Sequence, residues 1–567
     1  MNETKFEHLS NEVLIELFEH FNLVDLLYGF KDLNVRLNSL LFEKLSIFHL
    51  DLRGVSNMNY RLVVDTQHFP LIEKVQSIDL SNDDRTPGLP DQLIADGFGM
   101  NRFHQLRSLI LYEIHDKDLL FKLTDQCATL AFLTHFSIVQ CYFFLQQQDF
   151  GRWMNRIWNL PKLNYFYCDR DLAMGRFFNE LLFTSLTIEH LSLKHIEFRH
   201  DDLKHLFRFT PNLRRLSMKF IDDTKTSLLL ERNSTIIESF RLLANLSELT
   251  IRFGSMKLDG NQLESLLTHR PLKLRRFRFL MEFSICSSIK PDFHVEIDRI
   301  LKTFTSRFWL EEHRWFIRCD WSSVGNVTVY TVPFPSRHFI YSNQCFSKWT
   351  GIETSMFDRV EKLTIEDISK TLVTPLMRFS RLRNLELTLP IDVRCQPMII
   401  DYFHQLKIIF IRLPTYRFDY SIFQIILDRS INLYSLTVGT DGYLSLDEKF
   451  FHLKSSSIRR LAFINKRRQN IEYLNAEEFQ AFLEFPLAHQ CFTLCLAVPK
   501  PENILQMIKI MKNIRSLEII AAVIDEPINS DGETLQGLIK WLLDRLPLET
   551  RIEQGEFKEN LRLWFCR

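Results

Sequence analysis

Glycine and proline are scarce in this chain, at 16 and 18 of 567 residues, whereas 46% of the residues are hydrophobic. This composition argues against long disordered linkers, which are polar and rich in glycine or proline. The few glycines form neither GxGxxG nor GxxxxGKS/T, so no nucleotide-binding loop is predicted. The GxSxG and HExxH motifs of hydrolases and zinc peptidases are also absent. We therefore expect a folded chain without a catalytic site or a cofactor.

The chain carries no net charge, because 70 Lys and Arg residues balance 70 Asp and Glu residues. A neutral chain has no general attraction to nucleic acid or to an anionic membrane, so neither is a predicted partner. The longest apolar run, near residues 519–524, is too short to span a bilayer. The N-terminal residues lack the basic start and apolar run of a signal peptide. We predict a cytoplasmic protein, with the nucleus left open as a second location.

The ten cysteines are scattered and form no CxxC motif. No His or Cys cluster completes a zinc site beside the closest pair, Cys491 and Cys495, so buried free thiols are predicted. The most metal-like group lies in residues 195–205. There His200 and His205 are five residues apart, which does not place them on one face of a helix. We interpret that group as a solvated helix start and predict no metal site.

Residues 6–41 read FEHLSNEVLIELFEHFNLVDLLYGFKDLNVRLNSLL, with apolar residues at steps of three and four. That spacing predicts two short helices, each with an apolar face. Ser10 or Asn11 can cap the first helix, and Asn22 and Asp25 can begin the second. The pair carries more apolar surface than so small a unit can bury by itself.

This segment resembles an F-box over about forty residues. The matching positions are Leu9, Glu12, Val13, Leu14, Leu17, Phe18, Phe21, Asp25, Leu26, Leu27, Leu33, Arg36 and Leu37. Ser10, Leu33 and Leu37 depart from the proline, valine and tryptophan of the family pattern. The resemblance implies docking on the Skp adaptor of a ubiquitin ligase built on a cullin scaffold. The implied contact residues are Leu9, Ser10, Val13, Leu14, Leu17, Phe18, Phe21, Leu26, Leu27, Leu33 and Leu37. The alternative is a plain amphipathic helical pair that caps the next domain.

After this segment the pattern apolar-x-x-apolar-x-apolar occurs sixteen times. The matches begin at Ile47, Val75, Leu106, Leu133, Leu163, Ile188, Leu213, Leu246, Leu274, Val360, Leu382, Leu406, Leu433, Ile458, Cys491 and Ile514. The pattern is typical of leucine-rich repeats, in which a short strand sends alternate side chains into a shared core and a return segment leads to the next strand. Helical returns are predicted at residues 201–207 and 261–267.

The chain thus resembles the F-box/leucine-rich-repeat proteins, which implies an α/β solenoid with parallel inner strands and helical returns. We expect a short helical F-box followed by a curved, degenerate repeat array. The predicted segments are 1–45 for the F-box, 46–282 for the first repeats, 283–359 for a distorted repeat with a β-hairpin, 360–534 for the second repeats, and 535–567 for a C-terminal cap. Cys141 occupies the place where the family often has Asn or Cys bonding the turn backbone.

By that resemblance, the chain is predicted to be the substrate-recognition subunit of an SCF-type ubiquitin ligase. Outward strand positions in four successive repeats are rich in basic residues, which predicts a surface for an acidic or phosphorylated protein target. The proposed target-binding residues are Lys194, Arg215, Lys219, Arg252, Arg276 and Arg278. The aromatic positions Tyr165, Tyr167 and Phe410 offer another surface. The rival hypothesis is a non-ligase repeat scaffold or inhibitor whose N-terminal helices are only a cap.

Overall fold

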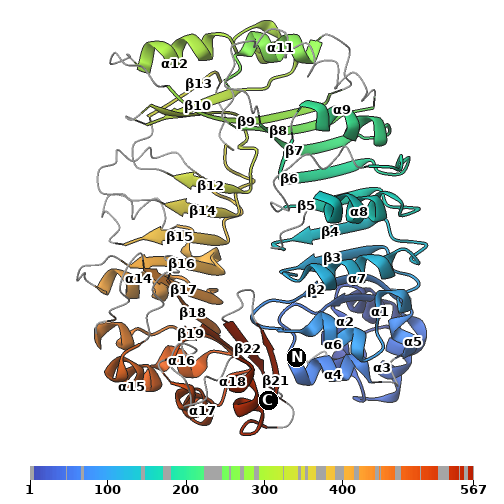
Figure 1. Cartoon of the computed structure of the whole chain (residues 1–567), viewed down its shortest axis with the longest axis vertical. Coiled ribbons are helices and arrows are strands. Elements are labelled where there is room, and N and C mark those ends of the chain that lie inside the picture. Colours follow the sequence, from blue (N-terminus) through green and yellow to red (C-terminus); the bar gives the residue numbers. More distant parts are fainter. Residues whose placement is uncertain are drawn as a thin grey trace. The chain divides into compact units, whose positions relative to one another are not determined.

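The computed structural model describes residues 6–45, 48–65, 69–141, 147–169, 181–198, 200–221, 245–254, 257–268, 274–285, 293–322, 325–341, 346–351, 356–365, 378–389, 401–413, 420–440, 446, 448–465, 474–498, 500–520, 535–547, 550–554 and 560–565 (Figure 1). Its contacts divide the chain into two compact units. The first holds Met1–Leu249 and Leu267–Arg276, and the second holds Thr250–Leu266 and Phe277–Phe565.

The first unit contains a parallel sheet whose strands follow chain order. These strands are β1 (Phe48–Asp51), β2 (Val75–Ser81), β3 (Ser108–Tyr112), β4 (His135–Val139), β5 (Tyr165–Cys168), β6 (His190–Phe198) and β7 (Arg215–Ile221). The returns between them carry α4 (Asn57–Val64), α5 (Phe69–Ile72), α6 (Leu89–Ala95), η4 (Met100–Arg102), α7 (Lys117–Cys127), α8 (Gln147–Trp158) and α9 (His200–Phe209).

The second unit begins with most of β8 (Glu248–Gly254) and β9 (Arg276–Ser284), together with α11 (Gly260–Thr268), α12 (Phe293–Lys302) and η6 (Phe308–Glu312). Here the parallel pattern gives way to an antiparallel set in the order β9-β11-β10-β13. The new strands are β10 (Ile317–Trp321), β11 (Asn326–Thr331) and β13 (Phe346–Trp349). Strands β10 and β11 form the predicted hairpin, with Trp321 opposite Val327.

A ten-stranded sheet completes the second unit, in the order β12-β14-β15-β16-β17-β18-β19-β20-β22-β21. Its strands are β12 (His338–Tyr341), β14 (Lys362–Ile365), β15 (Asn384–Thr388), β16 (Ile408–Leu413), β17 (Ser435–Thr440), β18 (Arg460–Asn465), β19 (Thr493–Ala497), β20 (Ser516–Ile520), β21 (Arg551–Gln554) and β22 (Asn560–Trp564). Its helices are η8 (Phe403–Gln405), α14 (Ser421–Arg429), η9 (Glu448–His452), α15 (Ala476–Glu484), α16 (Pro486–Gln490), α17 (Pro501–Ile510) and α18 (Leu535–Leu543).

All sixteen predicted motifs coincide with strands, namely β1 to β9 and β14 to β20. The second and third apolar residues of each motif are buried. Register explains the shared core, because Leu109 pairs with Ile78 on one side and with Phe136 on the other. The prediction of a mixed α/β repeat architecture with parallel strands and helical returns is therefore confirmed. The predicted curvature and the predicted segment boundaries stay predictions.

Other predictions about the interior also have an outcome. Of the ten cysteines, six are described, and all six are buried thiols outside any disulfide. Cys286, Cys345, Cys395 and Cys566 lie outside the described residues. The Cys141 thiol accepts a hydrogen bond from the Ile114 N–H (3.3 Å), as its place after the β4 strand predicts. Within the described ranges, no helix combines the length and apolar character needed to cross a bilayer.

The N-terminal segment consists of η1 (Phe6–His8), α1 (Asn11–Glu19), α2 (Leu23–Phe30), α3 (Val35–Ser39) and η2 (Leu40–Lys44). The first two predicted helices are present, and a short third helix follows. Helix α2 packs against β1 and α4 of the first repeat, and α1 packs against η2 (Figure 1). The segment is therefore seated on the start of the repeats.

Candidate functional site

Three side-chain caps fix where the N-terminal helices begin. The Ser10 hydroxyl accepts a hydrogen bond from the Val13 N–H (3.4 Å), and the Asn34 side chain accepts one from the Leu37 N–H (2.9 Å). Asn22 caps α2 in the same way. Arg36 then ties α3 to the start of α1, since its guanidinium donates to the Leu9 carbonyl (2.6 Å) and to the Asn11 side chain (2.8 Å).

Five of the residues predicted to contact the adaptor lie in the interior instead. Leu14, Phe18, Leu26, Leu27 and Leu37 are buried within the chain, so the prediction that they form an outward contact is wrong. The physical reason is that α2 packs on the first repeat while the Phe18 ring packs against Phe30. These side chains stabilise the segment and are not accessible to a partner.

The other predicted residues remain at the surface. Val13, Leu17 and Phe21 are exposed at steps of four along α1 and its end, and Leu33 is 62% exposed. Val35, which the sequence comparison with the F-box pattern did not single out, is 87% exposed. Leu9 is half-buried, and Ser10 is exposed but acts as a cap. We use the name outer apolar face for the exposed apolar residues of this segment, which are Val13, Leu17, Phe21, Leu33 and Val35.

Asn22 joins this segment to the edge of the first sheet. Its side-chain amide donates to the Asp51 carbonyl (2.9 Å), and its side-chain oxygen accepts from the Asp51 N–H (2.8 Å). These two hydrogen bonds accompany an isolated parallel β-bridge between Asn22 and His49. One side chain thus caps α2 and satisfies the backbone of the first strand.

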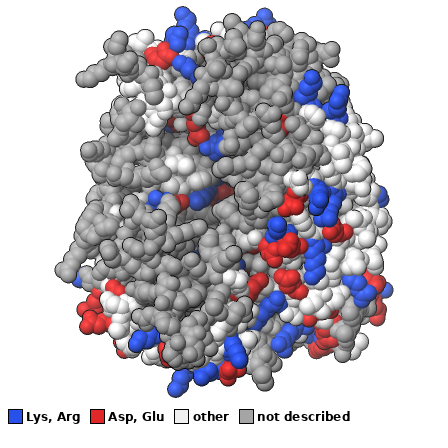
Figure 2. All heavy atoms as spheres, viewed as in Figure 1, with Lys and Arg blue, Asp and Glu red and all other residues white. Residues whose placement is uncertain are grey.

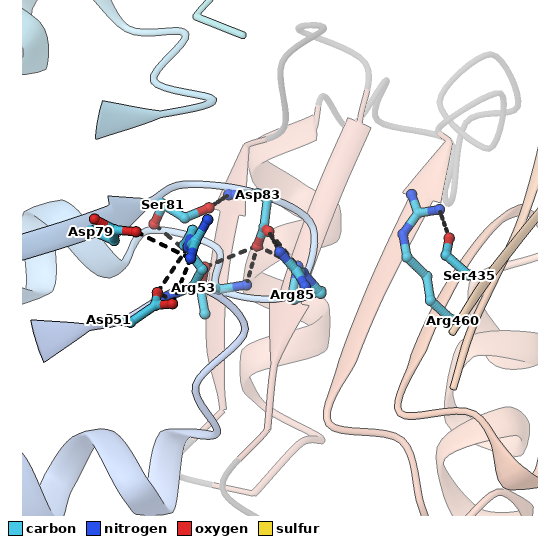
Figure 3. Close-up of polar contacts among 9 residues, drawn as sticks. Asp51, Arg53, Asp79, Ser81, Asp83, Arg85, Ser435 and Arg460 are labelled. Atoms are coloured by element: carbon cyan, nitrogen blue, oxygen red, sulfur yellow. Dashed lines mark hydrogen bonds and ion pairs between the residues drawn. The ribbon is translucent and has the colours of Figure 1, made fainter. Parts of the chain in front are cut away.

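Charged residues gather where β1 and β2 end on the outward side of the sheet (Figure 3). The Arg53 guanidinium bonds both oxygens of Asp51 (2.9 and 2.6 Å) and reaches Asp79 (3.1 Å). Burial opposes ionisation of Asp51, but the hydrogen bonds from Arg53 outweigh it and hold the pKa of that carboxyl below its usual range. Burial raises the pKa of Asp79.

The Asp51 and Asp79 carboxylates lie beside His49, with one ligand atom from each of the three residues within 4.8 Å of the others. This set of donors could hold a cation.

A second charged pair lies nearby in the same return. Asp83 accepts from the Arg85 Nε (2.8 Å), the Thr86 N–H (3.1 Å) and the Thr86 hydroxyl (2.9 Å). Figure 3 shows Asp83 and Arg85 pointing toward each other. Because Asp83 is buried and fully engaged with its own turn, it stabilises this loop and offers nothing to a ligand.

The predicted basic residues of the repeats are largely matched by acidic neighbours. Arg215 and Arg276 both reach the same oxygen of Glu248, at 3.4 and 3.3 Å. Arg252 pairs with Glu282 (2.6 Å). On the side of the molecule that Figure 2 draws, the described basic and acidic side chains are likewise interspersed. The predicted excess of basic charge is therefore smaller than the strand positions alone suggest.

The remaining predicted basic residues are half-buried. Lys219 lies on β7 and Arg278 on β9, and Lys194 donates to the Tyr167 hydroxyl (3.0 Å) and lies over that ring. Beside Tyr167 on the same strand, the Tyr165 ring stacks on His135, its register partner on β4, at 5.3 Å between centroids. Of the aromatic alternative, Tyr165 and Tyr167 therefore lie on β5 of this sheet, whereas Phe410 lies on β16 of the ten-stranded sheet, and their role in target binding stays a prediction.

Comparisons with known proteins do not assign a family. No family model matches the chain, and no curated protein matches it. Among solved structures, one match is titled "Crystal structure of TLR13-ssRNA13 complex", at 12% identity with a TM-score of 0.27. The match covers 75% of this chain and 62% of that chain. So low a TM-score carries no argument, and the repeat fold rests on the strand pairing itself.

Proposed function

We propose that this chain is the substrate-recognition subunit of an SCF-type ubiquitin ligase. In this proposal the N-terminal helices act as an F-box that binds the Skp adaptor, the adaptor joins the chain to the cullin scaffold, and the repeats hold a protein target. The chain itself performs no chemistry. It raises the concentration of the target near the ubiquitin-conjugating enzyme that the complex recruits.

The observation that carries the proposal is the outer apolar face. A helical cap would bury its apolar side on the first repeat and present polar residues to solvent. Here the inward side is filled by buried leucines, yet Leu33 and Val35 are still mostly exposed. A surface of this kind on a segment that follows the F-box residue order favours an external helical partner.

A specific contact favours the rival hypothesis of a non-ligase scaffold or inhibitor. Asn22 satisfies the backbone of β1, and α2 packs on α4, as expected of a capping segment. In the proposal, capping uses the buried side chains of this segment and adaptor binding uses its exposed ones. The experiment must therefore perturb the outer apolar face without disturbing the cap.

The test is the double variant Leu33→Glu, Val35→Glu in a pull-down with purified Skp adaptor. Each apolar side chain buried at an interface contributes roughly 1.5–3 kcal/mol before association costs, so we expect adaptor binding to weaken at least tenfold. Ile431→Glu is the matched control, because Ile431 is 67% exposed on the repeats. The circular dichroism melt of both variants should match that of the parent chain. Equal adaptor binding by the parent and the double variant would reject the F-box assignment.

Target binding is tested separately with Arg215→Gln, Arg276→Gln. These two guanidiniums share one carboxylate, so together they retain an excess positive charge that an acidic or phosphorylated segment could neutralise. We expect acidic partners to disappear from the proteins captured with the chain, as identified by mass spectrometry, while adaptor binding is kept. An unchanged partner list would move the target surface away from these residues, for example to Tyr165 and Tyr167.

A further inference from the structure

Three potential metal ligands meet on the outward side of the first two strands. His49 and Asp51 are two residues apart on β1, so their side chains point to the same side of the sheet. Asp79 on β2 is the direct register partner of Asp51. One ligand atom from each of the three residues lies within 4.8 Å of the others. The group is half-buried to buried, unlike the acidic clusters that commonly occur at exposed surfaces.

All three of these groups have lone pairs to offer a metal ion. Asp79 is only 5% exposed, yet its Oδ1 atom has no hydrogen-bond partner in the described part of the chain. A buried carboxylate oxygen without a partner is costly, so a ligand is favoured at this position. The His49 imidazole makes no hydrogen bond with any residue that the structure describes. Asp51 is bonded through both oxygens to Arg53, but a carboxylate has further lone pairs.

We propose that His49, Asp51 and Asp79 bind a divalent first-row transition-metal ion. One imidazole nitrogen and two carboxylate oxygens form a mixed set that suits zinc, cobalt, nickel or manganese better than calcium or magnesium, which prefer oxygen alone. The charge also fits. Two carboxylates and the Arg53 guanidinium leave one negative charge, which a divalent ion converts into one positive charge. None of these three residues belongs to the proposed adaptor or target surfaces.

Arg53 is the competitor at this site. Its guanidinium holds both carboxylates, so a metal ion must share them with it or displace it. The same guanidinium already lies 4.7 Å from the centre of the Tyr112 ring, which gives it a second partner. Removing the Arg53 charge should therefore tighten metal binding. If the two carboxylates served only as ion-pair partners of Arg53, the same change would destabilise the cluster and would not improve metal binding.

The experiment is a calorimetric titration of the full chain, first treated with a chelator, with Zn²⁺. Co²⁺ absorption reports the coordination. We expect one site that weakens at least tenfold in His49→Ala and in Asp79→Asn, and that tightens at least tenfold in Arg53→Met. His135→Ala, on the same sheet, is the matched control for adventitious binding by a histidine and should leave this site unchanged.

Several outcomes would overturn the proposal. The first is that the parent chain binds no Zn²⁺ at a Zn²⁺ concentration of about 100 micromolar, because a specific site should have a dissociation constant below that value. The second is an equal loss in the His135→Ala control, and the third is weaker binding in Arg53→Met with an unchanged melting curve. If Asp79→Asn fails to fold, the half-buried His49→Ala variant decides.

Discussion

Asn22→Ala is the perturbation that most directly probes how the N-terminal helices are fixed to the repeats. The substitution removes the cap of α2, which contributes about 1 kcal/mol. It also leaves the Asp51 N–H and carbonyl without their partner, at about 1 kcal/mol for each lost bond. The sum is about 3 kcal/mol, which corresponds to roughly a hundredfold increase in local opening.

Hydrogen exchange measured by mass spectrometry can locate this effect. We expect faster exchange in peptides covering α1, α2 and β1, with unchanged exchange in α15 and β19 of the second unit. Ser10→Ala is the control, because its cap is an exposed bond of 3.4 Å whose loss costs no more than about 1 kcal/mol. If Asn22→Ala and Ser10→Ala exchange equally, the Asn22 junction does not hold the segment in place.

Three further predictions concern stability. Asp320→Ala should destabilise the second unit by about 3–5 kcal/mol in urea unfolding, because it leaves the buried Arg318 guanidinium without its ion pair. Burial opposes ionisation of Glu386, but basic neighbours led by Arg412 lower its pKa to about 2 from 4.5. That carboxylate should therefore contribute about 3 kcal/mol above pH 4.5, lost as the pH falls towards 2, and Glu386→Gln should flatten this part of the pH–stability curve. Leu37→Trp should lower the melting temperature through overpacking of about 1–3 kcal/mol, since Leu37 is buried; an unchanged melt would contradict that placement.

The repeat motif predicted the strands well because its apolar positions are the positions that the fold buries. Each x-apolar-x-apolar run alternates between core and solvent, and neighbouring repeats place equivalent residues in register. Strand β12 was missed because Ser336 stands where the motif requires an apolar residue, although Phe339 and Tyr341 are buried in alternation. Strands β21 and β22 pair antiparallel, so a motif for parallel repeats cannot find them.

The candidate sites were harder to predict than the strands. Helical periodicity identified an apolar N-terminal segment, but it could not say which apolar residues pack inward when both sides of a helix are apolar. Leu14 and Val13 are adjacent in sequence, yet one is buried and the other exposed. For α2 a signal does exist in Asn22, which caps that helix and bonds the backbone of β1.

The metal-ligand group was missed for a different reason. His49 and Asp51 belong to one repeat and Asp79 to the next, so no sequence spacing typical of a metal site connects them. They meet because parallel pairing places Asp79 opposite Asp51. Aligning the outward positions of the first two repeats would have brought them together.

The central claim is tested most directly by hydrogen exchange of the chain with and without purified Skp adaptor. The proposed function predicts a complex in which new protection is confined to peptides covering residues 9–36, with α14 and β17 unchanged. Loss of that protection in the Leu33→Glu, Val35→Glu variant would tie it to the outer apolar face. Absence of any protection in residues 9–36 at saturating adaptor would contradict the account and leave the N-terminal helices as a cap of the repeats.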